Sequence, residues 1–477
     1  MSFPLLSRRR TKIVCTLGPA VANPEGVENL INAGMDMARI NCSHGEPEDR
    51  ARLAKLVRDA SAKLGRFIPI MFDLQGPKIR IGKLAEDIPL EDGDPLVIEV
   101  GKEIGTRDKV YTSYEGFATD VNPGEIVAVD DGKLRFEVLK VEGQTVTCTT
   151  LTGGVLKQRK GINLPDTKIS APSLSEKDLA DLEMAVQEQV DFVAVSFVRA
   201  ASEVVDVRRR AKAMGNHNLQ FISKIERPEA IKDLIGIINT SDGVMVARGD
   251  LGVEIGSHRV PMIQKEIIAR SNRAGKFVIT ATQMLDSMMD RPVPTRAEAS
   301  DVANAILDGT DACMLSGETA SGKYPIESVE TMARIAVESE SHNVYRYRSP
   351  SFPSGSIHEI PDGISIAAYQ TANLMGANLL IAFTNSGGSA LTLSKKHPNT
   401  LIVGATINEY AARRMQAYWG VIPMMLNKPT TVEDMFEQVK VEVLKQGLAR
   451  EGEIAVLTAG YPLWESGTTN LMRVMEL

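Results

Sequence analysis

The chain has 477 residues and a formal net charge of −7, with 43% hydrophobic and 24% charged residues. This length exceeds what one hydrophobic core usually organises, so two to four domains are expected. The acidic balance argues against a nucleic-acid-binding protein, which normally carries a basic surface. Four scattered cysteines, no export signal and no apolar window of transmembrane length lead us to expect a cytoplasmic protein without a membrane partner.

Short apolar runs alternate with amphipathic stretches along the first two thirds of the chain, which is typical of parallel α/β architecture. The apolar runs lie at 12–17, 35–41, 68–73, 191–197, 220–226, 244–248, 277–282 and 312–316. The amphipathic stretches lie at 25–33, 46–64, 175–189, 200–214, 258–274 and 326–340. Eight strands is the number in a (β/α)₈ TIM barrel, so the sequence predicts that fold.

Between residues 77 and 165 the helical pattern gives way to short alternating runs separated by turn residues. This pattern predicts a small β-barrel lid, inserted into the catalytic barrel of residues 1–76 and 166–345. The two ends of the insert must lie close together, because both join the barrel. A polar stretch at 346–361 is the expected linker to a C-terminal α/β domain within residues 346–477. The elements expected there are helices at 363–375, 408–417 and 431–446 and strands at 379–384, 401–405, 421–426 and 453–458.

Polar side chains close the predicted barrel strands at their C-terminal ends, where barrel enzymes place their reacting groups. In chain order they are Arg39, Asn41, Ser43, His44, Asp73, Lys224, Glu226, Asp250, Thr282 and the residues 316–319. Side chains alternate along a strand, so Arg39 and Asn41 share one face, as do Lys224 and Glu226. This convergence predicts an active site at the barrel mouth.

Glu226 and Asp250 end neighbouring predicted strands, which lie about 4.8 Å apart, so they can hold one cation between them. Mg²⁺ favours such a site, because it binds one or two carboxylates and leaves its other positions to phosphate and water. The lack of cysteine and histidine ligands argues against zinc. Lys224 beside the cation suits a phosphoryl group in transfer, and Arg39 adds a second cationic contact.

Each of these groups also has a purely structural interpretation. Lys224 and Glu226 can form an ion pair at the barrel rim, and Asp73 and Asp250 can cap the helices that follow them. Such roles explain the residues singly. They do not explain why cations, carboxylates and hydroxyl groups gather on one face.

Several long motifs resemble those of the pyruvate kinase family, in the family's order along essentially the whole chain. They are ARINCSHG (38–45), DLQGPKIR (73–80), ISKIERPE (222–229), MVARGDLGVEI (245–255), ATQMLDSM (281–288), the run 294–325 and SGTTN (466–470). The resemblance implies phosphoryl transfer from phosphoenolpyruvate to ADP, which gives pyruvate and ATP in the last step of glycolysis. It also implies Mg²⁺ as the cofactor, with Mn²⁺ as a substitute, and an allosterically regulated homotetramer.

The resemblance also implies roles for single residues. Lys224, Arg39 and Thr282 match catalytic residues: Lys224 stabilises the transferring group, Arg39 contacts the phosphate, and Thr282 lies near the carbon that gains a proton. Glu226 and Asp250 match the Mg²⁺ ligands, and the backbone of Gly249 and Asp250 lies close to the substrate carboxylate. The residues that match nucleotide contacts are Asn41, His44, Arg80 and Lys160.

One motif departs from the common family pattern. Many members bind K⁺ through positions equivalent to Asn41, Ser43 and Asp73, and carry threonine after that aspartate and glutamate in GPEIR. This chain has Leu74 and Lys78 at those two positions. A lysine ammonium can itself supply the monovalent charge, so K⁺ is expected to be non-essential. The alternative is that Lys78 points into solvent.

A second candidate site lies in the C-terminal domain. Thr384, Asn385, Ser386, Gly387, Gly388 and Ser389 follow a predicted strand and open a helix, and the 466–470 loop is placed to close over them. Small residues with free N–H groups there can bind phosphate. An ordinary strand–turn–helix connection explains them equally well. The family resemblance favours a phosphorylated small-molecule effector, which is a sugar phosphate or a nucleotide.

Two other functions stay open. Another Mg²⁺-dependent barrel enzyme of phosphoenolpyruvate or pyruvate chemistry, such as an aldolase or a phosphomutase, would need neither the insert nor Lys160 nor a nucleotide. A catalytically silent, effector-binding homologue would need only the C-terminal site. The intact set of Lys224, Glu226, Asp250 and Thr282 argues against the silent homologue.

Overall fold

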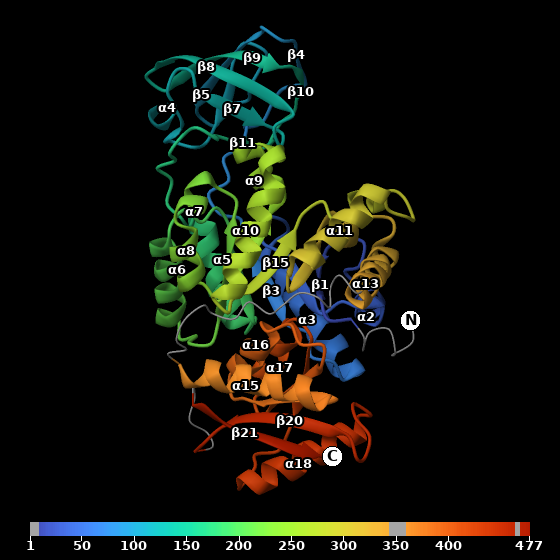
Figure 1. Ribbon diagram of the computed structural model, residues 1–477. Coiled ribbons are helices and arrows are strands. Elements are labelled where there is room, and N and C mark those ends of the chain that lie inside the picture. The colour runs from blue at the N-terminus through green and yellow to red at the C-terminus, as the bar shows by residue number, and fades with distance from the viewer. Residues whose placement is uncertain (1–8, 343–358, 463–467) are drawn as a thin grey trace.

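The computed structural model describes residues 9–342, 359–462 and 468–477. In Figure 1 the inserted β domain lies at one end of the molecule, the barrel in the middle and the C-terminal α/β domain at the other end. Among the described residues, no helix combines the length and the apolar character that crossing a membrane requires. Most of the expected linker 346–361 lies outside the described residues.

Eight parallel strands close into a barrel in the order β1-β16-β15-β14-β13-β12-β3-β2. The predicted (β/α)₈ fold is therefore confirmed. The strands are β1 (Lys12–Leu17), β2 (Met37–Asn41), β3 (Ile70–Asp73), β12 (Phe192–Val195), β13 (Gln220–Ile225), β14 (Gly243–Ala247), β15 (Phe277–Ala281) and β16 (Ala312–Leu315).

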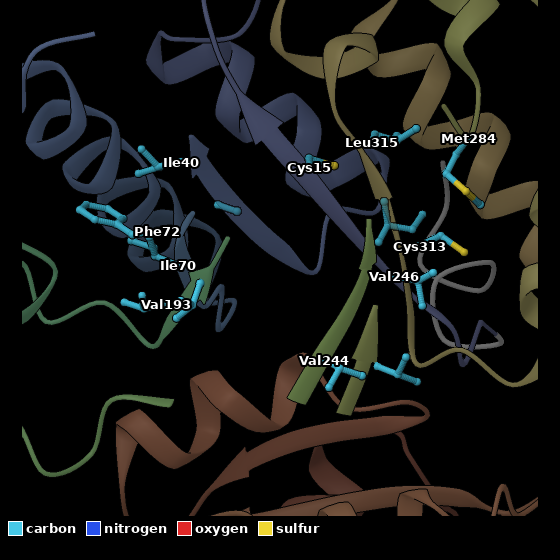
Figure 2. Packing of buried hydrophobic residues seen from close by; sticks show 14 of the residues in the cluster. Cys15, Ile40, Ile70, Phe72, Val193, Val244, Val246, Met284, Cys313 and Leu315 are labelled. Atoms are coloured by element: carbon cyan, nitrogen blue, oxygen red, sulfur yellow. The ribbon is translucent and has the colours of Figure 1, made fainter. Parts of the chain in front are cut away.

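Side chains along each barrel strand alternate between two apolar layers. Phe72, Val244 and Cys313 belong to the layer between the strands and the surrounding helices, part of which Figure 2 shows. Their chain neighbours Met71 and Met245 belong to a separate cluster, which fills the barrel interior. Burial on both faces explains why these strands appear in the sequence as continuous apolar runs.

Helices surround the barrel strands. They are α2 (Pro24–Ala33), α3 (Pro47–Leu64), α5 (Glu176–Gln187), α6 (Ala201–Ala213), α7 (Pro228–Lys232), α8 (Leu234–Thr240), α9 (Arg248–Ile255), α10 (Val260–Arg273), α11 (Arg296–Asp308), α12 (Gly317–Ala320) and α13 (Pro325–Ser341), with 3₁₀ turns η1 (Ser257–Arg259) and η2 (Asp286–Met289). Capping boxes start α5 at Ser175 and α11 at Thr295. In each box the N-cap hydroxyl accepts a hydrogen bond from the backbone N–H of the third helical residue. The carboxylate of that residue accepts one from the backbone N–H of the N-cap residue.

The insert follows β3 and consists of a six-stranded sheet, in the order β11-β7-β8-β9-β5-β6, and a two-stranded sheet of β10 and β4. Its elements are β4 (Ile88–Leu90), β5 (Pro95–Val100), β6 (Val110–Thr112), α4 (Phe117–Asp120), β7 (Ile126–Val129), β8 (Leu134–Glu142), β9 (Thr145–Thr152), β10 (Gly154–Leu156) and β11 (Ile162–Asn163). The Ile162 backbone N–H donates to the Ile79 carbonyl at 2.9 Å, so its ends are adjacent, as expected.

The C-terminal domain is a five-stranded sheet in the order β19-β18-β17-β20-β21. Its elements are α15 (Ile360–Met375), β17 (Leu379–Phe383), α16 (Gly388–Ser394), β18 (Leu401–Thr406), α17 (Glu409–Gln416), β19 (Val421–Met425), α18 (Val432–Lys445), β20 (Ile454–Gly460) and β21 (Thr469–Glu476). The last strand, which pairs antiparallel with β20, was not among the expected elements. The residue boundaries expected for the three domains stay predictions.

The barrel and the C-terminal domain share one apolar cluster. It runs from the barrel interior to the connection between α17 and β19, where the ring of Tyr418 lies 6.2 Å from that of Phe277, centroid to centroid. Polar bonds cross the same junction. Lys395, at the end of α16, forms a fully buried ion pair with Asp311, which directly precedes β16.

Candidate active site

Lys224 lies at the centre of a buried charge cluster where β13 reaches the barrel mouth. Its Nζ is 3.2 Å from Asp73 Oδ1 and 3.0 Å from Glu226 Oε1, and it donates to Ser196 Oγ at 2.7 Å. Burial alone would lower the pKa of Lys224. The carboxylates of Asp73 and Glu226 outweigh burial and raise that pKa above its ordinary value, so the side chain stays an ammonium ion.

Asp73 connects this ammonium to Arg39 on β2. Arg39 Nε donates to Asp73 Oδ2 at 2.7 Å, and Arg39 Nη1 donates to Thr16 Oγ1 at 2.9 Å. Burial would raise the pKa of Asp73, but Lys224 and Arg39 hold it below its ordinary value. The two strands are neighbours in the barrel, with Asn41 opposite Asp73. Two cations are therefore fixed side by side through one shared carboxylate.

Asn41, Ser43 and Asp73, the expected monovalent-cation residues, are also neighbours. The Ser43 backbone N–H donates to Asn41 Oδ1 at 3.1 Å, and the Cys42 N–H donates to the Asp73 carbonyl at 2.9 Å. Lys177, on α5, is bonded to the Cys42 carbonyl and so holds this loop from the outside. The Asp73 carboxylate itself is already bonded to Arg39 and Lys224.

Glu226 and Asp250, the expected Mg²⁺ ligands, follow the adjacent strands β13 and β14. Glu226 comes directly after its strand, whereas Asp250 lies in the first turn of α9, three residues past its strand. The expectation that Asp250 ends a strand is therefore corrected. Phe197 N–H donates to Glu226 Oε2 at 2.7 Å, while the buried Glu226 Oε1 lies 3.0 Å from the Lys224 ammonium.

The residues present fit a divalent ion that is shared with a substrate. Burial, together with the Asp250 charge, raises the pKa of Glu226 above its ordinary value, although Lys224 acts in the other direction. A divalent cation near Glu226 Oε1 would relieve that cost. No group of three or more His, Cys, Asp or Glu side chains in the described residues could hold a metal by itself. Two carboxylates with open positions suit Mg²⁺, which keeps water and substrate oxygens in its octahedron.

Thr282 and Gly249 are held together on the other side of the mouth. The Gly249 N–H donates to Thr282 Oγ1 at 2.8 Å, and Arg248 Nη2 donates to the Thr282 carbonyl at 2.7 Å. Thr282 has a positive φ of 69°, which places its backbone in the sparsely populated left-handed region. These contacts hold the Thr282 hydroxyl group against the start of α9.

Lys78 lies beside Asp250, one of the two expected ligands of the divalent ion. Its Nζ is 3.7 Å from Asp250 Oδ1, and its side chain is 25% exposed. The side chain therefore does not simply point into solvent. The positive charge of Lys78 therefore lies next to the carboxylate of Asp250. The negative charge of Asp73 is neutralised by Arg39 and Lys224.

The expected nucleotide residues lie where the insert meets the barrel. Lys160 Nζ is 2.8 Å from Asp130 Oδ1, and Arg80 Nη1 donates to the Arg159 carbonyl at 3.2 Å. Burial, followed by the charges of Arg80 and Arg39, lowers the pKa of His44, so its imidazole is neutral at pH 7.

A cleft of about 1470 Å³ opens between the insert and the barrel. Residues from both units line it, including Lys78, Asp131, Arg135, Asp250 and Thr282.

Sequence reasoning missed several residues that hold the cluster. Ser196 Oγ donates a hydrogen bond to the Leu74 carbonyl at 2.6 Å and accepts one from Lys224 Nζ. Thr16 Oγ1 accepts a hydrogen bond from Arg39. Ser196 lies near the C-terminal end of the apolar run 191–197, as the predicted site residues do in their own runs. Its position therefore could have indicated a site residue. The Phe197 contribution is a backbone N–H, which no residue type reveals.

The candidate effector segment connects β17 to α16. The Gly387 N–H donates to Thr384 Oγ1 at 3.1 Å, and Asn408 Nδ2 donates to the Asn385 carbonyl at 2.9 Å. Ser389 Oγ lies 2.5 Å from Thr469 Oγ1, so the C-terminal motif does reach this segment. The first two residues of that motif, 466 and 467, lie outside the described residues.

Fold and site together define a (β/α)₈-barrel enzyme whose mouth is suited to phosphoryl transfer. The model of the pyruvate kinase barrel domain matches residues 8–329, and that of the pyruvate kinase alpha/beta domain matches residues 362–475. Pyruvate kinases of Geobacillus stearothermophilus, Staphylococcus saprophyticus and Staphylococcus aureus are 42%, 41% and 40% identical to this chain. Each similarity covers 98% of this chain and 80% of the relative. The chain belongs to the pyruvate kinase family, whose reaction transfers a phosphoryl group from phosphoenolpyruvate to ADP.

Proposed function

We propose that Lys224, Arg39 and Thr282 carry out this transfer at the barrel mouth, with the insert as a lid. The observation that carries the proposal is the buried Lys224 ammonium, 3.2 Å from Asp73 and 3.0 Å from Glu226, next to Arg39. Phosphoryl transfer needs positioning and positive charge more than covalent help from the protein. A cationic cluster at the barrel mouth supplies both.

In the proposed reaction, an oxygen of the ADP β-phosphate attacks the phosphorus of phosphoenolpyruvate in line. The bond from phosphorus to the enol oxygen breaks as the new bond forms, and the resulting enolate gains a proton at carbon. Lys224 and Arg39 balance the charge of the group in transfer. The Gly249–Asp250 backbone binds the substrate carboxylate, and the protonated carbon faces Thr282. The insert excludes water, which would otherwise hydrolyse the phosphate.

Glu226 and Asp250 would hold the divalent ion, Mg²⁺ or Mn²⁺, whose chemistry is to neutralise and orient phosphate oxygens. The nucleotide phosphates would bind between the barrel residues Asn41 and His44 and the insert residues Arg80 and Lys160. In the structure Lys160 is paired with Asp130, so a nucleotide phosphate would compete with that carboxylate.

The test is pyruvate formation from phosphoenolpyruvate, ADP and Mg²⁺. We expect rapid turnover that disappears when ADP is left out. Turnover of phosphoenolpyruvate that does not depend on ADP would favour another barrel enzyme of this chemistry. No turnover under any condition would favour a silent effector-binding homologue.

We further propose that this enzyme does not require K⁺, because the Lys78 ammonium supplies a fixed positive charge at the mouth. Wild-type turnover is expected to be nearly the same with and without K⁺. Lys78→Glu is expected to create or strengthen a K⁺ requirement, because it replaces that charge by a carboxylate near Asp250. Lys83→Glu, the same exchange at an exposed position of the insert, is the control. Equal activity of Lys78→Glu with and without K⁺ would contradict the proposal.

A homotetramer and a phosphorylated effector bound at Thr384–Ser389 complete the proposal. The contact of Ser389 with Thr469 supports a closed pocket of small residues there. Sedimentation analysis tests the tetramer. Calorimetric titration with sugar phosphates and nucleotides tests the effector, and Ser389→Asp should abolish the binding by placing a carboxylate against the phosphate.

A further inference from the structure

Two buried charged residues that the proposed reaction does not use stand next to the proposed metal ligands. Arg227 directly follows Glu226, and Glu254 lies one helical turn after Asp250 in α9. Arg227 Nη1 donates to Glu254 Oε2 at 2.8 Å, and the two side chains are only 3% and 1% exposed. The pair therefore links the two chain segments that carry the carboxylates.

Arg227 also donates to the carboxylate of Glu229, at 3.2 and 3.3 Å. The other bonds of the pair go to residues 163–167, the segment that leads from the insert back to the barrel. Arg227 Nη1 donates to the Leu164 carbonyl at 3.3 Å, and Nη2 donates to the Thr167 carbonyl at 3.0 Å. Asn163 Nδ2 donates to Glu254 Oε1 at 2.9 Å. A buried ion pair is tolerated only when its other donors and acceptors are bonded, and here the returning chain and Glu229 satisfy them.

The anchored segment begins immediately after the two ends of the insert pair with one another. Arg80 and Gly161 form an antiparallel bridge, and the Ile162 N–H is bonded to the Ile79 carbonyl. From Asn163 onward the chain is bonded to the barrel through Arg227 and Glu254. The position of the insert over the cleft is thereby tied to these two side chains.

We infer that Arg227 and Glu254 are positioning residues, which hold the segments of Glu226 and Asp250 at a fixed spacing and tie both segments to the insert. The inference rests on the proposed function, because that function assigns the two carboxylates to the divalent ion. A purely structural pair would stabilise the fold without affecting metal affinity or the nucleotide. The experiments below separate these two cases.

The first variant, Asn163→Ala, cuts the bond between Glu254 and the insert and leaves the Arg227–Glu254 pair intact. We expect the KM for ADP to rise about 10-fold, the loss typical of a hydrogen bond to a charged group, because the insert carries Arg80 and Lys160. The KM for phosphoenolpyruvate should stay within about two-fold, since Arg39 and Lys224 are untouched. Deuterium uptake of the backbone amides in 160–170 should rise. Asn122→Ala, whose amide is bonded only within the insert, is the control.

The second variant, Arg227→Met/Glu254→Met, removes both charges together, so that no single charge is left buried. We expect the affinity for Mn²⁺, titrated without substrate, to fall about 10-fold, as is common when supporting partners of metal ligands are lost. Arg199→Met/Glu203→Met is the matched control. That ion pair also contacts the returning chain, through the Ile169 carbonyl, but neither of its residues follows a metal ligand. The control should leave Mn²⁺ affinity within about two-fold.

Unchanged Mn²⁺ affinity and unchanged KM for ADP, with only a lower melting temperature, would overturn the inference and leave the pair a structural one. A wild-type protein that binds Mn²⁺ but forms no pyruvate would refute the proposed function. In that case Mn²⁺ affinity and deuterium uptake would still decide the inference, because neither measurement needs turnover.

Discussion

At the scale of single residues, the barrel mouth balances its charges in a place with little water. Lys224 is 13% exposed and contacts Asp73 and Glu226, each 1% exposed, while Arg39 supplies the second cation. Ionic contacts act more strongly in such a site than at a wet surface. Under the proposed function the cluster is preorganised for a phosphoryl group, since Lys224 is already an ammonium ion before the ligand arrives.

Lys224→Met is expected to lower kcat by about 100- to 1000-fold, the range found when one preorganised donor to a transition state is lost. Asp73 and Glu226 would then repel an incoming phosphate with no ammonium between them. The measurement is steady-state pyruvate formation, with the melting temperature followed in parallel. Lys212→Met, on the exposed side of α6, is the control and should be silent. Wild-type turnover in Lys224→Met would contradict the proposed role of Lys224.

The proximity of Arg39, Asp73, Lys224 and Glu226 could be predicted from the sequence, because parallel strands bring their carboxyl ends to one edge. Their roles stay proposals. The hydrogen-bond and ion-pair partners of these side chains could not be predicted. Asp73 is shared by Arg39 and Lys224 because strands of the closed barrel converge, and the backbone N–H of Phe197 is supplied by a local turn that leaves no mark on residue type.

At the scale of elements, all eight barrel strands were predicted, whereas α9 and α11 were not among the expected helices. Each barrel strand is buried on both faces and so appears as an apolar run. In contrast, α9 holds two glycines and charged residues within eight positions, so its helical pattern is weak. The Thr295–Glu298 capping box could have predicted the start of α11. The antiparallel strand β21 follows residues 463–467, and only pairing with β20 defines it.

The turn after β3 gives a prediction about the outgoing end of the insert. Gly76 has a φ of +69°, and a Cβ there would lie 2.8 Å from the Phe197 ring and 2.9 Å from Ser196 Cβ. Gly76→Ala would displace both residues, and with them the partners of Glu226 and Lys224. We expect kcat to fall at least about 10-fold, in addition to a strain cost of about 1–2 kcal/mol.

The matched control for this prediction is Gly93→Ala, in a turn of the insert. Gly93 has a φ of +90° and no atom within 4 Å of the position of a Cβ, so the exchange adds backbone strain without a clash. In urea unfolding, Gly93→Ala should lose only the strain cost, and Gly76→Ala should lose more because of the added clash. Only Gly76→Ala should lose turnover. Equal turnover of the two variants would show that the Gly76–Phe197 contact does not support the site.

At the scale of the whole molecule, the barrel and the C-terminal domain are joined by a continuous core with buried charges at its edge. Tyr418 packs against Phe277 within the shared cluster, and Lys395 is buried against Asp311. The sequence predicted a separate C-terminal domain but gave no sign of this junction, because its residues belong to two different predicted units. A shared core predicts that the two units unfold together.

The same junction gives the molecule a pH-dependent stability through Lys12. Lys12 Nζ donates to the Val421 carbonyl at 2.8 Å, and burial lowers the pKa of Lys12 from 10.5 to about 8, although Asp36 acts to raise it. Between these two pKa values the unfolded chain binds more protons than the folded one. The free energy of unfolding therefore rises with pH across that window. From pH 7 to pH 9 this contribution amounts to about 1 kcal/mol.

The measurement is urea unfolding of the wild type and of Lys12→Met at pH 7 and pH 9. Every other titrating group is common to both proteins, so the difference between their two pH responses isolates Lys12. The wild type should gain about 1 kcal/mol more than the variant on going to pH 9. Lys12→Arg should behave like Lys12→Met in this respect, since a guanidinium stays charged throughout the range. Equal pH responses of all three proteins would mean that Lys12 is already neutral at pH 7 or is hydrated in the folded state, and that the junction is not a titrating one.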